Sequence, residues 1–287
     1  MSEIRKVRLT LKSRSTLEGA GVRLKRAFGY ADPSLDPFLL LDDFRSDDPN
    51  DYLAGFPWHP HRGIETITYM LHGRVEHGDS MGNSGVIGAG DVQWMTAGSG
   101  IIHQEMPKGN KNDSLMGGFQ LWANLPASHK MMNPRYRDIT KEQIPEVIVN
   151  DTVRVKVICG EVNGVKGPVQ DIVTEPEYLD VSIEPNSEFK HSIDKSHNVF
   201  AYVIEGSAFF DPSLHEITGS EHLAIFKEGD EVLIQTRDEP VRFLLISGKP
   251  IGEPVAWRGP IVMNTEEELR IAFDEYNKGT FIKHKKS

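Results

Sequence analysis

Short stretches rich in Val, Ile, Thr and aromatic residues recur along the whole chain, and Gly, Pro, Asn and Asp separate them. Typical examples are "ETITYML", "FQLWANL", "VRVKVI", "VFAYVIEG" and "VRFLLIS". Each stretch is long enough for one strand, and the residues between the stretches favour turns. The pattern therefore predicts an all-β protein built as sandwiches or barrels.

The two halves of the chain carry matching stretches. Residues 69–73 read Tyr-Met-Leu-His-Gly and residues 202–206 read Tyr-Val-Ile-Glu-Gly, and a Gly-Asp turn into a further strand follows each of them. A repeat of this size predicts two tandem barrels, and a chain of 287 residues is long enough for both. We expect the join in "HKMMNPRYRDITKEQIPEV", which gives an N-terminal domain over residues 1–132 and a C-terminal domain over residues 133–287.

One short helix is expected near the C-terminus, within the second domain. In "NTEEEL", Glu268 follows Thr265 by three residues, which predicts a capping box at the start of a helix. Apolar residues then recur at helical spacing, at Leu269, Ala272, Phe273 and Tyr276.

Composition excludes several classes of function. The formal net charge is −10, so we expect no direct binding of nucleic acid, which requires basic side chains. No apolar run approaches the ~18 residues of a membrane span, and the charged N-terminus does not resemble a secretory signal. Cys159 is the single cysteine, so no intrachain disulfide is expected. These features predict a cytoplasmic protein with no membrane partner, or a nuclear one if the chain is eukaryotic.

Two pairs of polar residues interrupt the apolar strands. His59 and His61 are separated by one residue, as are His103 and Glu105, so each pair points to one face of its strand. By the same alternation Glu65 is expected on the face of His59 and His61. A single inward histidine is usually a hydrogen-bonded core residue, but several unsatisfied polar groups in one core would cost roughly 1–3 kcal/mol each. A metal ion that takes these side chains as ligands removes that cost.

The stretches "HPHRGIET", "GDVQWMTAGSGIIHQEMP", "GFQLWANLP" and "GKPIGEPVAWRGPIVMNTEEE" resemble the pirin family of the cupin superfamily over nearly the whole chain. The resemblance implies a bicupin, with two tandem jelly-roll barrels and one iron in the N-terminal barrel. It places the four metal ligands at His59, His61, His103 and Glu105. Glu65 would then lie beside the metal without binding it, hydrogen-bonded to a ligand histidine or to water.

Three imidazoles and a carboxylate suit a divalent metal, with Fe²⁺ expected and Mn, Co, Ni, Cu or Zn as alternatives. Pirins and related cupins cleave the flavonol quercetin with dioxygen, so the resemblance implies a quercetin 2,3-dioxygenase-like enzyme whose substrates are an aromatic flavonol and O₂. Glu105 would accept the proton of the flavonol 3-hydroxyl. The pocket walls are expected to include apolar residues that could equally be ordinary core: Phe56, Trp58, Met95, Met106 and Trp122.

Two alternatives to this enzyme remain at the level of sequence. Some pirins are redox-sensing, metal-dependent regulatory proteins that bind a transcription factor or a metabolic enzyme, so a protein partner is the main alternative. A zinc hydrolase is the other, although no further acid–base group is evident beside the ligands. The second barrel is expected to be metal-free, because the positions matching the four ligands hold Ser192, Asp194, Arg242 and Leu244.

Overall fold

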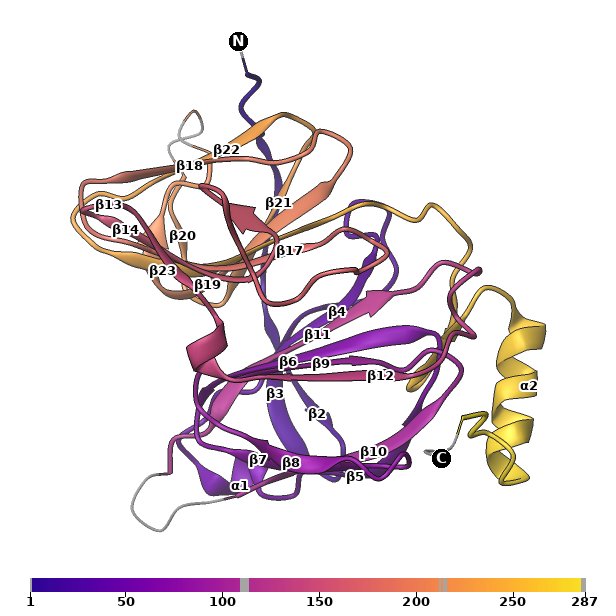
Figure 1. Ribbon diagram of the computed structural model, residues 1–287. Coiled ribbons are helices and arrows are strands. Elements are labelled where there is room, and N and C mark those ends of the chain that lie inside the picture. The colour runs from indigo at the N-terminus through magenta and orange to yellow at the C-terminus, as the bar shows by residue number, and fades with distance from the viewer. Residues whose placement is uncertain (1, 109–113, 212, 214–215, 285–287) are drawn as a thin grey trace. The chain divides into compact units, whose positions relative to one another are not determined.

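The computed structural model describes residues 2–108, 114–211, 213 and 216–284. Strands dominate these residues, which confirms the all-β prediction (Figure 1). The chain divides into two compact units, and each unit is described by itself. Unit 1 comprises Met1–Arg14, Asp32–Pro37 and Glu142–Pro250, and unit 2 comprises Ser15–Ala31, Phe38–Lys141 and Ile251–Ser287.

Among the described residues, unit 2 contains two large sheets, the two-stranded sheet β24-β25 and both α-helices. Its strands and helices are β2 (Arg14–Glu18), β3 (Val22–Gly29), β4 (Phe38–Asp43), α1 (Pro49–Tyr52), β5 (Phe56–His61), β6 (Ile64–His72), β7 (Val75–Asp79), β8 (Ser84–Ile87), β9 (Val92–Thr96), β10 (Ile101–Pro107), β11 (Gly117–Asn124), β12 (Arg135–Ile139), β24 (Ala256–Arg258), β25 (Ile261–Met263) and α2 (Glu266–Asn277). Seven strands form one sheet in the order β12-β9-β6-β11-β4-β3-β2, and four form a second in the order β5-β10-β7-β8. Figure 1 shows β5, β7, β8 and β10 grouped apart from β6, β9, β11 and β12.

Unit 1 contains one large sheet and two small ones. Its strands are β1 (Val7–Lys12), β13 (Glu146–Asn150), β14 (Val153–Cys159), β15 (Glu161–Val162), β16 (Val165–Lys166), β17 (Glu177–Ile183), β18 (Glu188–Ser192), β19 (Asn198–Ala208), β20 (Thr218–Gly219), β21 (His222–Phe226), β22 (Glu231–Gln235) and β23 (Val241–Gly248), and the short 3₁₀ turn Lys141–Gln143 precedes β13. The large sheet has the order β1-β21-β19-β23-β17-β14-β13, with β20 paired to β19. A cluster of buried Val, Ile, Leu and Phe side chains fills this unit.

The repeated stretches occupy equivalent places in the two units. Residues 69–73 close β6, which pairs with β9 and β11, and residues 202–206 lie in β19, which pairs with β21 and β23. Gly73 and Gly206 both have positive φ, at 74° and 72°, a conformation that glycine adopts without steric cost. The sequence repeat therefore marks corresponding strands of the two units, each with a glycine of positive φ.

The two compact units interleave along the chain, so they are not separated at a single position. The N-terminal strand β1 pairs with β21 of unit 1, so residues 1–14 group with the second half of the chain. Residues 251–287, including α2, group instead with unit 2. Backbone pairing and a shared core outweigh position along the chain, because a strand edge and an apolar helix face must both be covered.

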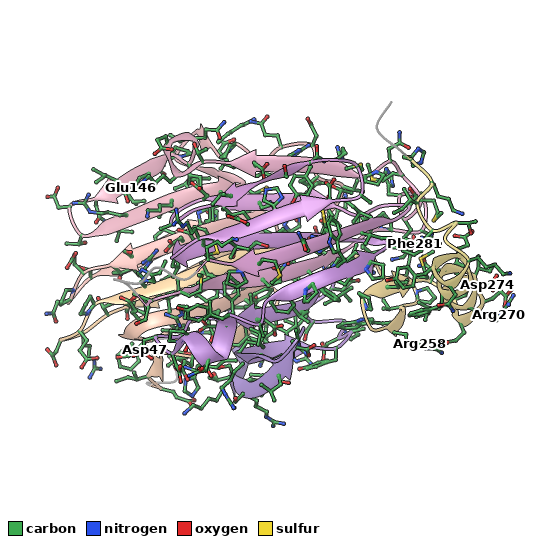
Figure 2. The ribbon with its side chains drawn as sticks, turned by 90° about the horizontal axis from the view of Figure 1, so that it is seen from below. Asp47, Glu146, Arg258, Arg270, Asp274 and Phe281 are labelled. Carbon is green, nitrogen blue, oxygen red and sulfur yellow. The ribbon has the colours of Figure 1, made fainter. Side chains whose placement is uncertain are left out.

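The C-terminal helix begins as predicted. Thr265 is the N-cap of α2, and both hydrogen bonds of the capping box with Glu268 are present. Leu269 and Ala272 pack with Ile261, Met263 and other apolar side chains of the C-terminal segment, and Ile102 of β10 contacts the same cluster. Figure 2 shows Arg270 and Asp274 on this helix, with Arg258 and Phe281 beside it. Within the described residues, no helix combines the length and the apolar character that crossing a bilayer would require.

Candidate metal centre

Three histidines meet where β5 and β10 pair. The strands are antiparallel, with His59 opposite His103 and His61 opposite Ile101. Because side chains alternate along each strand, all three imidazoles point to the same face. One ring nitrogen from each lies within 4.8 Å of the others, and this is the single such grouping of three His, Cys, Asp or Glu residues in the part of the chain that the structure describes. The predicted histidine ligands are thus brought together.

Hydrogen bonds determine which ring nitrogen of His59 and of His61 is available to bind a metal. Nδ1 of His59 lies 2.8 Å from the Pro57 carbonyl oxygen, and Nδ1 of His61 lies 3.0 Å from the Pro260 carbonyl oxygen. A carbonyl only accepts, so each Nδ1 carries a proton and donates it. In the neutral rings, each Nε2 then holds a lone pair. Metal-binding histidines are commonly oriented in this way, by donating their other N–H to a carbonyl or carboxylate.

The two lone pairs face each other. Nε2 of His59 and Nε2 of His61 are 3.1 Å apart, and two acceptors this close repel unless a cation lies between them. Two nitrogen atoms that bind one ion at right angles, with bonds of about 2.1 Å, would lie about 3 Å apart. The separation therefore fits a shared metal ion.

His103 completes the case for a metal. His103 is 1% exposed, and neither its Nδ1 nor its Nε2 has a hydrogen-bond partner among the described residues. Burial lowers the pKa of His59, and lowers the pKa of His61 and His103 well below the usual range, so all three rings are neutral and able to bind a metal. An unpartnered buried imidazole costs free energy that coordination would recover. The residues present fit a metal ion.

Glu105, the fourth predicted ligand, lies in the same pocket but outside the group of three. Its carboxylate accepts a hydrogen bond from Thr68 Oγ1, with Oε1 3.1 Å away. A register shift in β10 between His103 and Glu105 places Glu105 opposite Phe56. Burial raises the pKa of Glu105 to about 7, and the hydrogen bond from Thr68 partly offsets this effect. Glu105 is therefore a buried carboxyl that gains and loses a proton near neutrality in the metal-free protein.

Glu65 does not lie where strand alternation placed it. Its carboxylate accepts hydrogen bonds from Trp94 Nε1 at 3.1 Å and from Thr96 Oγ1 at 2.6 Å, and burial raises its pKa. The expected bond to a ligand histidine is not among its contacts with the described residues. The prediction assumed one strand from His59 to Glu65, but β5 ends at His61 and the turn at Gly63 starts a new strand, β6.

Replacing Glu65 by glutamine should therefore leave the metal site intact. The amide has one acceptor oxygen for two donors, so we expect the free energy of unfolding to fall by about 1–3 kcal/mol. The affinity for metal should change by less than about tenfold. Urea unfolding of the metal-free protein and competition with a chelator would measure the two effects. A hundredfold loss of affinity with unchanged stability would instead place Glu65 at the metal.

The C-terminal segment holds the loop between β5 and β6. Arg62 is buried and its guanidinium binds the carbonyls of Ser99 and Phe281 and, at 2.8 Å, the carboxylate of Glu275. A Cβ atom on Gly63, whose φ is 78°, would lie 1.9 Å from the Val262 carbonyl oxygen, so only glycine fits there. With the bond from His61 to the Pro260 carbonyl, these contacts fix the position of one ligand from about 200 residues away in sequence.

A buried lysine adds to this support. Lys130 Nζ donates to the carbonyls of Gly63 and Val262, at 2.9 and 3.2 Å, and to Asn124 Oδ1 at 2.6 Å. Burial lowers its pKa to about 8. Sequence reasoning missed both Lys130 and Arg62, because nothing local distinguishes them from exposed basic residues. Their proximity to glycine turns was the one available signal.

A cavity of about 720 Å³ opens beside the histidines within unit 2. His59, His61 and Glu105 line it, and its remaining walls are mainly apolar and aromatic, including Phe44, Tyr52, Phe56, Trp122 and Trp257. Trp122 meets His61 edge to face, with ring centroids 5.1 Å apart. Volume and lining are typical of pockets that bind small molecules.

The other residues expected in the pocket wall lie elsewhere. Met95 packs in a core cluster with Ile64 and Ile101. Trp58 and Met106 lie on the opposite face of β5 and β10, where Trp58 is exposed and both line a separate shallow depression. Alternation explains this placement, because the neighbouring His59 and Glu105 already face the cavity.

Comparison with known proteins agrees with this architecture. The family model described as pirin matches residues 21–123, and that of the pirin C-terminal cupin domain matches residues 178–282. A pirin-like protein of Caulobacter vibrioides is 42% identical, over 97% of this chain and 99% of that protein. Human pirin is 41% identical, over 96% of this chain and 93% of its own.

A solved structure extends the likeness to the fold. The crystal structure titled quercetin 2,3-dioxygenase from Acinetobacter baumannii has a TM-score of 0.89 and 31% identity, covering 97% of this chain and 98% of that one. The two barrel-like units are thus cupin domains. With both family models matched and relatives above 40% identity along almost its full length, the chain belongs to the pirin family.

Proposed function

We propose that this protein is a metal-dependent dioxygenase, with Fe²⁺ as its ion, that cleaves flavonols such as quercetin with O₂. The observation that carries the proposal is the group of three neutral histidines, two of which line a cavity whose other walls are mainly apolar and aromatic. The quercetin 2,3-dioxygenase from Acinetobacter baumannii supports it as a relative of the same fold. A divalent ion bound here would stabilise an anionic substrate oxygen and, as iron, would supply the redox chemistry that dioxygen requires.

The protein's own residues divide the remaining tasks. We propose that His59, His61, His103 and Glu105 hold the ion, and that Glu105 also accepts the proton of the flavonol 3-hydroxyl at Oε1 or Oε2. The raised pKa of Glu105 suits this task, because a base is most effective when its pKa lies near the working pH. Thr68, which donates to Oε1, orients the carboxylate. Trp122 and Trp257 line the cavity and offer aromatic surface on which the rings of the substrate can pack.

The proposed metal and the single cysteine both bear on the cellular compartment of the protein. Ferrous iron and a free thiol both persist in a reducing compartment. Cys159 is buried and its thiol lies 3.3 and 3.2 Å from the carbonyls of Val169 and Pro176. We therefore propose a cytoplasmic protein.

The test is an oxygen-electrode assay on protein loaded with Fe²⁺ under argon. Addition of quercetin in aerated buffer should consume one O₂ and release one carbon monoxide for each quercetin lost. Protein stripped by a chelator should lose the activity, and fresh Fe²⁺ should restore it. Fully loaded protein that consumes no O₂ with quercetin would contradict the proposal and favour the regulatory alternative, a metal-dependent partner for another protein.

A further inference from the structure

A row of polar side chains crosses the wall of the cavity, away from the histidines. Arg26 on β3 is paired with Asp42 on β4, Asp42 with Gln120 on β11, and Gln120 with Thr68 on β6. All four line the cavity, so they form one continuous line across four adjacent strands. We call Arg26, Asp42, Gln120 and Thr68 the polar row.

One end of the polar row reaches the metal centre. Thr68 Oγ1 lies 3.1 Å from Glu105 Oε1 and 2.8 Å from Gln120 Oε1. Neighbouring strands are about 4.8 Å apart, so the three steps from Thr68 to Arg26 span roughly 14 Å. A rigid molecule of three aromatic rings is of comparable length. A substrate that presents an oxygen to the metal would therefore extend along the polar row toward Arg26.

The far end of the polar row is acidic. Arg26 binds both carboxylate oxygens of Asp42, through Nε and NH2 at 2.8 Å each, and its NH1 lies 2.8 Å from Glu18 Oε1. Glu18 also lines the cavity. One guanidinium facing two carboxylates leaves a formal charge of −1. This end therefore accepts hydrogen bonds from hydroxyl groups and repels a ligand that carries a carboxylate or phosphate.

Apolar surface flanks the polar row. Leu40 on β4 is paired with Trp122 on β11, two residues along from Asp42 and Gln120 on the same face. An aromatic ring can pack on this surface while its hydroxyl groups reach the row. The side-chain amide of Gln120 also lines the cavity, where it can form a hydrogen bond with a ligand carbonyl, ether or hydroxyl oxygen.

From this arrangement we infer that the polar row and Glu18 form a second recognition site, which selects elongated aromatic substrates with phenolic hydroxyl groups at the end opposite the metal. The inference rests on the proposed function for the oxygen that the metal takes. The row fixes the orientation of the substrate and rejects anionic analogues. Arg26 neutralises and holds the two carboxylates, and it is not itself a site for an anion.

The test compares three flavonols bound to protein loaded with Fe²⁺ without oxygen. Quercetin has hydroxyl groups on both outer rings, 3-hydroxyflavone has none there, and 4′-carboxy-3-hydroxyflavone carries an acid at the far end. Quenching of tryptophan fluorescence gives each Kd. The native protein should bind quercetin at least roughly tenfold more tightly than 3-hydroxyflavone, as expected for hydrogen bonds to charged groups, and should bind the acid most weakly.

Two substitutions should remove the preference of the protein for quercetin over 3-hydroxyflavone. Glu18→Gln and Asp42→Asn should each weaken quercetin binding by roughly tenfold and change the Kd of 3-hydroxyflavone less than about twofold. Both should improve binding of the acid, because each removes a negative charge. Glu18 is partly exposed, so we expect Glu18→Gln to fold. If Asp42→Asn does not fold, Glu18→Gln alone tests the role of the polar row.

The matched control is Asp180→Asn in unit 1. Arg242 binds Asp180 through Nε and NH2 at 2.9 and 2.7 Å, a pair with nearly the same geometry and exposure as Arg26 and Asp42. This variant should keep the native preference. An equal preference in the native protein and in Glu18→Gln would overturn the inference. Binding with the expected selectivity but without O₂ consumption would contradict only the proposed dioxygenase, and turnover without selectivity would contradict only the polar row.

Discussion

Replacement of His103 by alanine is expected to abolish stoichiometric metal binding while leaving the metal-free protein folded. Both ring nitrogens of His103 are buried and have no partner in the part of the chain that the structure describes, so the substitution forfeits no hydrogen bond there in the metal-free state. The native protein should gain about 2.7 kcal/mol of stability at a metal concentration a hundred times the Kd, and His103→Ala should gain almost none. Metal content by plasma mass spectrometry, and thermal unfolding with and without metal, would measure the two effects.

His191→Ala provides the matched control. His191 is a mostly buried strand histidine of unit 1 whose Nε2 lies 3.2 Å from Glu177 Oε1, so it already has a partner. This variant should keep one metal per chain and should lower the stability of the protein equally with and without metal. Full metal occupancy in His103→Ala would exclude the proposed centre. Loss of metal from both variants would point instead to general unfolding.

The shared face of His59 and His61 could be predicted from sequence because it depends on local geometry, whereas the place of His103 beside them was implied only by the resemblance to pirins. Alternation along a single strand needs no knowledge of the fold, and it correctly placed His59 with His61 on β5. The same reasoning failed for Glu65, because the turn at Gly63 lies between the two strands and resets the alternation. The alternation of side chains predicts which face a residue occupies within one strand, but it cannot be continued across a turn of unknown form.

The supports of the centre could not be predicted, because they come from distant parts of the chain. The Pro260 carbonyl, which orients His61, follows a strand that sequence reasoning assigned to the other domain. The polar row was equally hidden, since Arg26, Asp42 and Gln120 become neighbours only when the register of three strands is known. Alternation predicts which face a side chain occupies, but only strand pairing determines what lies beside it.

Glu105 provides the sharpest test of the chemistry, because one side chain is assigned both metal binding and proton transfer. In the metal-free protein its pKa is raised to about 7 by burial. Burial lowers the pKa values of the three histidines, so their side chains are already neutral at the pH where Glu105 loses its proton. Below pH 7 a metal must displace the proton of Glu105 in order to bind its carboxylate. Metal affinity should therefore rise with pH up to about 7 and level off above it.

Glu105→Gln should separate these two roles. The amide has no proton to release, so the pH dependence of metal affinity near 7 should disappear. The three histidines should still bind the ion, with lower affinity. Flavonol turnover at matched metal loading should fall by roughly 10²–10⁴-fold, since the amide cannot accept the substrate proton. Thr68→Val is the companion variant, because loss of its hydrogen bond should raise the pKa of Glu105 further and move the pH midpoint upward. Near-normal turnover in Glu105→Gln would exclude Glu105 as the base, and an unchanged pH profile would exclude its carboxylate as a ligand.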